Sequence, residues 1–206
     1  MTAMPHSLKW LLCLCLLAGG LAGQRPATPF GPTDYSAVMV IHLKGGATQR
    51  MAIAKRGMMW RSRIAIPGHT MTELINLKTR MAYMIMPGMC MKHALPNLPP
   101  GGMLAQAQQN HAQTVDLGPA TVTTGDGKTY ACEHSRVTYT VHGKKQTMDV
   151  YAAKALKNFP VKLTTMQNGH TVTVTYEHIH LTPPAASLFA PPAHCGGMPG
   201  MPGFPH

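Results

Sequence analysis

Residues 161–181, VKLTTMQNGHTVTVTYEHIHL, contain the pattern that decides the fold. Two runs rich in β-branched residues flank the dipeptide Asn168-Gly169. An Asn-Gly pair between two such runs is the strongest short sequence signal for a β-hairpin, because both residues accept the positive φ angles of a tight turn. The stretch therefore predicts two antiparallel strands.

The alternation of apolar and polar residues in the second strand of this hairpin shifts by one position near the end of the strand. Its apolar residues occupy even positions up to Tyr176 and odd positions from Ile179 onward. A β-bulge near Glu177 would explain the change and would turn His178 and His180 outward. In an unbroken strand both imidazoles would point inward, where they need polar partners or a metal ion. We favour the bulge.

Similar runs repeat along the chain and are separated by turn signals such as Pro67-Gly68 and Pro87-Gly88. One stretch is rich in helix formers and predicts a short helix from Gly102 to Asn110. About nine or ten hairpin-linked strands without a βαβ rhythm predict a mainly β protein, whose antiparallel sheet must curl fully or partly closed to bury one face. The helix can then act as a lid. The expected strands are 35–44, 51–56, 58–66, 71–77, 80–86, 121–124, 130–142, 146–153, 161–166 and 170–181.

Residues 1–24 are typical of an export signal. Lys9 precedes an apolar run from Trp10 to Ala22, and small residues follow. The run is shorter than the roughly 20 residues that a membrane span needs. Gln24 follows Leu21-Ala22-Gly23 where a lipoprotein signal would have cysteine, so no lipid attachment is expected. The expected organisation is a signal peptide (1–24), a Pro-rich linker (25–33), one β domain (34–194) and a disordered Met/Pro/Gly tail (195–206).

Charge and motifs exclude two broad classes of function. Without Lys9 the chain has 17 Lys and Arg against 7 Asp and Glu, a net charge of +10, but these charges are scattered and no nucleic-acid motif accompanies them. We expect no nucleic-acid partner. The sequence also lacks nucleophile-elbow, zinc-protease and phosphate-loop motifs and paired acids, so we expect no catalytic residues and no enzyme activity.

Three passages resemble a known family. They are GMMWRSRIAI with TELINLKTRMAYMIMP, then TTGDGKTYACEHSRVTYTV, and finally MDVYAAKALKNFPVKLTTMQNGHTVTVTYEHIHLTPPAASLFAPPA. Together they make the chain similar, over roughly residues 34–194, to exported bacterial proteins of unknown function within the LolA/LppX-like superfamily of lipoprotein carriers.

The resemblance implies a half-open antiparallel β-barrel with a helix as lid over an apolar concave face. It also implies a periplasmic or secreted protein that binds a lipid or acyl chain without a covalent bond and without a cofactor, and that could associate transiently with the envelope membrane. A structural envelope or interaction module without any ligand is an alternative. The residues that we expect to line the cavity are Met39, Ile41, Trp60, Ile64, Met84 and Met86.

Residues 81–93, MAYMIMPGMCMKH, raise a second alternative, a periplasmic copper-binding or copper-stress protein. The part before Pro87-Gly88 is most simply a strand whose methionines form an adaptable apolar wall. The part after it combines thioether, thiol and imidazole groups, which select copper(I). The candidate ligands are Met89, Cys90, Met91 and His93, together with His194 and Cys195 of the tail.

Whether Cys90 can bind a metal ion depends on whether it forms a disulfide. Cys90, Cys132 and Cys195 remain after signal removal, and an oxidising compartment favours one disulfide and one free thiol. The sequence alone leaves the pairing open. We favour Cys90–Cys132, because Cys195 belongs to the Gly/Pro-rich tail. A disulfide-bonded Cys90 could not bind a metal ion.

Overall fold

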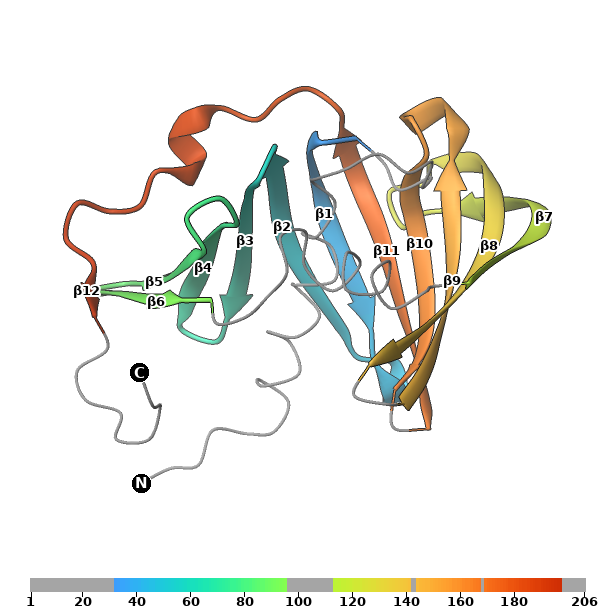
Figure 1. Cartoon of the computed structure of the whole chain (residues 1–206), viewed down its shortest axis with the longest axis horizontal. Helices are drawn as coiled ribbons and strands as arrows, with labels where there is room; N and C mark the ends of the chain where they lie inside the picture. The colour runs from blue at the N-terminus through green and yellow to red at the C-terminus, as the bar shows by residue number, and fades with distance from the viewer. Residues whose placement is uncertain (1–31, 96–112, 142–143, 168, 198–206) are drawn as a thin grey trace.

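The computed structural model describes residues 32–95, 113–141, 144–167 and 169–197, and Figure 1 shows their arrangement. Most of these residues form β-strands. Three short 3-10 turns accompany the strands: η1 (Lys44–Gly46), η2 (Lys154–Leu156) and η3 (Ala186–Phe189). The strands are β1 (Asp34–His42), β2 (Thr48–Arg56), β3 (Met59–Ile66), β4 (His69–Asn76), β5 (Met81–Met86), β6 (Met89–Ala94), β7 (Gln113–Thr123), β8 (Thr129–Val141), β9 (Lys144–Ala153), β10 (Phe159–Gln167), β11 (His170–His180) and β12 (Gly196–Gly197).

All twelve strands belong to one sheet in the order β12-β6-β5-β4-β3-β2-β1-β11-β10-β9-β8-β7. Every neighbouring pair is antiparallel except β12 and β6, which run parallel. Pairing of β1 with β11 joins the two ends of the domain at the centre of the sheet (Figure 1). Within the described residues the end strands β7 and β12 do not pair with each other, so the curved sheet is a half-open barrel. The mainly β, antiparallel fold is thus confirmed, whereas the expected lid helix, 102–110, lies outside the described residues.

The predicted bulge is present in β11. Ser36 of β1 lies opposite His180, while Val38 lies opposite Glu177, so β11 has one more residue than β1 between these pairs. His178 has a φ angle of 50°, which accommodates the extra residue. His178 and His180 are exposed and Ile179 is buried, as the change of phase predicts.

β6 and β7 differ most from the sequence-based expectation, and β12 lies in the segment that was expected to be a disordered tail. β6 was not predicted as a strand, yet Pro87-Gly88 forms a two-residue turn that places Met86 opposite Met89. β7 begins at Gln113 rather than near residue 121. It is an edge strand with mostly exposed side chains and a register shift between Asp116 and Gly118, so its sequence has little of the usual alternation.

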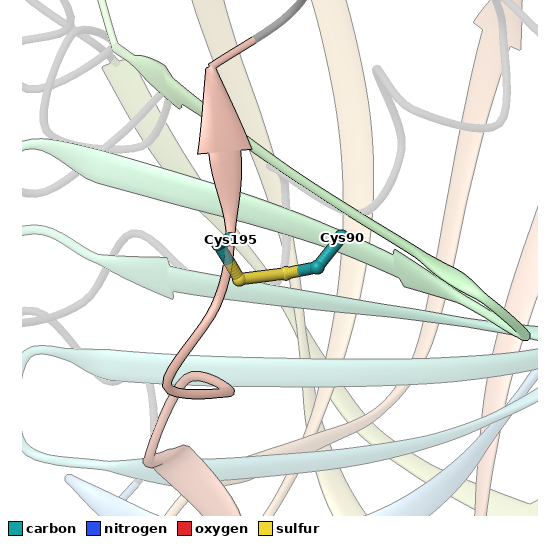
Figure 2. The surroundings of a disulfide bond; sticks show 2 residues. All are labelled: Cys90 and Cys195. Carbon is teal, nitrogen blue, oxygen red and sulfur yellow. A yellow bond between two sulfur atoms is a disulfide. The ribbon is translucent and has the colours of Figure 1, made fainter.

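The predicted Cys90–Cys132 disulfide is wrong. Cys90 of β6 is bonded to Cys195, with Cα atoms 4.7 Å apart (Figure 2). Cys132 is a buried free thiol. Cys132 lies on β8, which is near the other end of the strand order from β6. The C-terminal segment brings Cys195 to β6 directly, because Gly196 pairs with Met91 in the adjoining β12.

The C-terminal segment runs from the end of β11 past β3 to β6 (Figure 1). Arg56 donates a hydrogen bond to the carbonyl oxygen of Pro184 at 2.9 Å, and Phe189 of η3 is buried. These contacts and the disulfide hold the segment along its length. Among the described residues no helix is long and apolar enough to span a membrane.

Candidate functional site

The side of β1–β6 that carries the core side chains is called the inner face below. Side chains alternate between the two faces of a strand, and directly paired residues share a face. By this rule the six residues predicted to line a cavity all lie on the inner face, although whether a ligand contacts them stays a prediction. Met39, Ile41, Trp60 and Ile64 are buried, and Met84 and Met86 are half-buried.

Four aromatic rings form a cluster in the core beside this face. The ring of Tyr35 meets those of Trp60 and Phe159 edge-on, with centroids 6.3 and 4.8 Å apart. Phe159 meets Tyr176 in the same way at 5.2 Å. Because Phe159 and Tyr176 come from β10 and β11, the cluster joins the two halves of the sheet around β1.

Lys55 projects from the inner face of β2 into this apolar surrounding. It lies directly between Tyr35 of β1 and Trp60 of β3 in the strand register, and the whole residue is only 1% exposed. Its Nζ atom has no hydrogen-bond partner among the described residues. Burial lowers the pKa of Lys55 to about 8, although the charge of Asp34 opposes the change. The inner face therefore holds a buried cationic group whose hydrogen bonds are unused.

Two further nitrogen atoms without partners lie in the same lateral row. Strand pairing connects Lys55, Trp60, Ile75, Ala82 and His93 in order from β2 to β6. The Nε1 atom of Trp60 and the Nδ1 atom of His93 are both buried and find no hydrogen-bond partner within the described part of the chain. Buried polar groups are normally satisfied, so a row with three unsatisfied nitrogen atoms is a candidate site for a polar ligand group.

A buried carboxyl group lies in the adjacent row. Glu73 of β4 is 7% exposed and is paired with Ser62 of β3 and with Met84 of β5. Burial raises the pKa of Glu73 to about 7, and a hydrogen bond of 3.4 Å from the Ser62 hydroxyl partly offsets this effect. Near neutral pH Glu73 is thus divided between its acid and carboxylate forms.

Methionine dominates the remaining inner face. Met84 lies opposite Met91, and Met86 lies opposite Met89, across the β5–β6 hairpin. The strand register also puts other methionines on this face, with Met39 opposite Met51 and Met71 opposite Ile64. Thioether side chains of this kind form a surface that is apolar, polarisable and able to adapt its shape.

The structure separates the predicted metal ligands. Cys90 and Cys195 are bonded to each other, so neither can bind a metal ion as a thiolate. Cys90 also lies on the opposite face of β6 from Met89, Met91 and His93. The described residues contain no group of three or more His, Cys, Asp or Glu side chains arranged to hold a metal ion. The thioether and imidazole candidates of β6 therefore remain, without the two cysteines.

Sequence reasoning missed Lys55, Glu73 and Ser62. A signal for them exists in the alternation itself, since Lys55 has the same parity as Met51 and Ile53. A charged residue in phase with a core pattern indicates a buried charge.

A hollow lies on the opposite face of the sheet. It has a volume of about 260 Å³, and Val38, Arg50, Ala52 and Arg63 are among its lining residues. Arg50 forms an ion pair with Glu177, which is buried, while the Arg50 side chain itself is about half exposed. This hollow is open to solvent, and among the described residues none of the buried nitrogen atoms without a hydrogen-bond partner belongs to its lining.

No family model and no curated protein matches the sequence. Solved structures do match: a LolA superfamily protein, NE2245 from Nitrosomonas europaea, at 9% identity and a TM-score of 0.39, covering 86% of this chain and 96% of that one. LprF from Mycobacterium bovis matches at 13% identity and a TM-score of 0.35, covering 90% of this chain and 99% of that one.

Proposed function

We propose that this chain is an exported periplasmic protein that binds a lipid or acyl chain non-covalently on its inner face, with an acidic head group at Lys55. The observation that carries the proposal is the Lys55 ammonium group, which is buried among aromatic rings without a hydrogen-bond partner in the described residues. A buried charge without a partner costs several kcal/mol. A ligand carboxylate or phosphate group would offset this cost.

The methionine-rich wall supports the apolar half of the proposal. Burying a methylene group contributes about 0.8 kcal/mol, so an acyl chain gains affinity from length alone, before the costs of association. Met84 and Met86 are half-buried on the inner face, which leaves them partly accessible. Their flexible side chains can adapt to acyl chains of different length and unsaturation.

Binding rather than catalysis is the proposed activity. The one free thiol among the described residues, Cys132, is buried, and burial raises its pKa, so it is a weak nucleophile near neutral pH. Export rests on the signal expected in residues 1–24, and release from the membrane after cleavage is part of the same proposal.

Fatty-acid binding to the purified full chain tests the proposal. Palmitate and the cationic surfactant cetyltrimethylammonium have chains of equal length and heads of opposite charge. We expect the protein to bind palmitate at least about 10-fold more tightly, a difference of about 1.4 kcal/mol, and Lys55→Met to abolish the preference. The matched control is Lys92→Met, which removes an exposed lysine from β6.

The outcomes separate the parts of the proposal. Equal palmitate affinity in wild type and Lys55→Met would refute the role of Lys55 while leaving apolar binding intact. A second result would refute the proposed function as a whole. The protein would bind neither palmitate nor cetyltrimethylammonium, and native mass spectra of protein from its own periplasm would show no co-purified lipid. That result would favour a structural envelope protein or interaction module.

A further inference from the structure

The β5–β6 hairpin gathers four thioethers and one imidazole on a single face. Met84 is paired with Met91, Met86 with Met89, and Ala82 with His93. Directly opposed residues on antiparallel strands have Cβ atoms about 4.5–5.5 Å apart. A methionine side chain has three rotatable bonds, so the four sulfur atoms have the reach to converge on one point above the hairpin.

His93 provides an observation that is independent of the methionines. Its Nδ1 atom is buried and has no hydrogen-bond partner among the described residues. The residue opposite it, Ala82, is small and fully buried, so the imidazole has an apolar neighbour where a polar partner would be expected. A buried ring nitrogen without a hydrogen bond is available as a metal ligand.

Exposure distinguishes these methionines from core methionines. Met39 and Met51 are 1% and 2% exposed, as expected of side chains that only fill the core. Met84, Met86 and Met91 are half-buried, and Met89 is 45% exposed. Large apolar side chains at this accessible edge of the sheet contribute less to core packing, and an ion from solvent can reach their sulfur atoms.

We propose that Met84, Met91 and His93, which lie in adjacent rows of the strand register, form a copper(I) site on the inner face of the β5–β6 hairpin, with Met86 and Met89 beside it. Thioether sulfur is a soft donor that selects copper(I) over zinc, magnesium and calcium, and a neutral imidazole is compatible with it. The site needs no cysteine. Cys90 lies on the other face of β6 and is disulfide-bonded, so it is not a ligand. Thioethers form no disulfides, so the methionines stay available as ligands in an oxidising compartment.

The site goes beyond lipid binding and is tested apart from it. The background is the chain without its expected signal peptide (residues 25–206) and with Cys132→Ala, so that Cys90 and Cys195, which are bonded to each other, are its two remaining cysteines. Silver(I), a redox-inert substitute for copper(I), needs no reductant and leaves the disulfide intact. Protein labelled with ¹³C in the methionine methyl groups is titrated with silver(I) and followed by NMR, and copper(I) affinity is measured by competition with bicinchoninate.

We expect one ion per chain, with the largest shifts in the methyl signals of Met84 and Met91. Met84→Leu with Met91→Leu should lower copper(I) affinity at least about 10-fold, and His93→Phe should also weaken binding. Leucine is apolar and of similar volume, so the double variant removes two thioether sulfur atoms without opening a cavity. The control Met166→Leu, an exposed methionine of β10, should bind copper(I) as the background protein does.

Two results would overturn the site. One is unchanged copper(I) affinity after all four hairpin methionines are replaced by leucine, with the fold verified by circular dichroism. The other is loss of binding when only Met198 and Met201 are changed to leucine, because the ion would then belong to the C-terminal tail.

Discussion

Gly125, in the β7–β8 turn, lies so close to Glu177 of β11 that no side chain fits between them. A Cβ atom at position 125 would stand well under 3.0 Å from Oε1 of Glu177. The same turn is held to β11 by Asp126, whose carboxylate accepts a hydrogen bond of 2.9 Å from the backbone N–H of His178. The β11 bulge is thus the point at which the β7–β8 hairpin contacts the centre of the sheet.

We expect Gly125→Ala to destabilise the protein by about 1–3 kcal/mol, the usual range for an overpacked site. The added methyl group must displace the Glu177 carboxylate, which is buried and paired with Arg50. Urea denaturation of wild type and variant measures the difference. In a Glu177→Ala background the same change should cost much less, and an equal cost in both backgrounds would show that contact with Glu177 is not the reason.

Glu73 should make stability depend on pH. Its pKa in the folded state is about 7, above its ordinary value of 4.5, so between these values the folded chain binds more protons than the unfolded chain. The free energy of unfolding should therefore fall as pH rises from about 4.5 to 7, by up to about 3 kcal/mol, and change little from this cause above pH 7.

Glu73→Gln isolates this contribution from those of the other titratable groups. Urea denaturation at pH 5, 6, 7 and 8 should show that the variant gains stability relative to wild type as pH rises. Parallel curves for the two proteins would contradict the burial of an ionisable Glu73.

Lys55→Met should stabilise the protein while removing acid recognition. The lysine is charged at pH 7 in both states, and its pKa of about 8 in the folded state, against 10.5 ordinarily, indicates a cost of about 3 kcal/mol for holding the charge inside. Methionine fills a similar volume without that charge. A higher midpoint of thermal unfolding together with lower palmitate affinity is the expected pair of results, and a destabilised variant would show that Lys55 has a stabilising partner.

Loss of the disulfide should destabilise the chain. Cys90→Ser with Cys195→Ser opens a loop of 105 residues, and removal of such a bridge costs roughly 2–4 kcal/mol. Cys132→Ser should leave the bridge formed. Mass spectrometry of unreduced peptides verifies the pairing, and a Cys90–Cys132 peptide would contradict it.

The sequence predicted those elements whose signals are local. Alternation and Asn168-Gly169 sufficed for the β10–β11 hairpin, and the change of phase located the β11 bulge. β6 was not predicted, because a run of Met, Cys and His is as typical of a metal site as of a β-strand. Most of β7 was not predicted, because an edge strand with exposed side chains does not need to alternate apolar and polar residues.

Features that depend on distant segments could not be predicted in this way. The pairing of Cys90 with Cys195 depends on the path of residues 181–195 past β3, which no local pattern specifies. Likewise, the convergence of Met84 and Met86 with Met89 and Met91 depends on β6 being a strand. These four residues share a face because the Pro87-Gly88 turn is two residues long, which the sequence alone does not specify.

The Cys90–Cys195 bond also makes part of the chain a covalent ring. The ring closes through β6 and the C-terminal segment and contains β7–β11, while β1–β5 lie outside it. A protease that cuts one peptide bond between residues 90 and 195 therefore leaves both pieces in one molecule. Nicked protein should migrate as a single band on a gel without reductant and as two bands with it, so half of the backbone can be broken once without loss of any fragment.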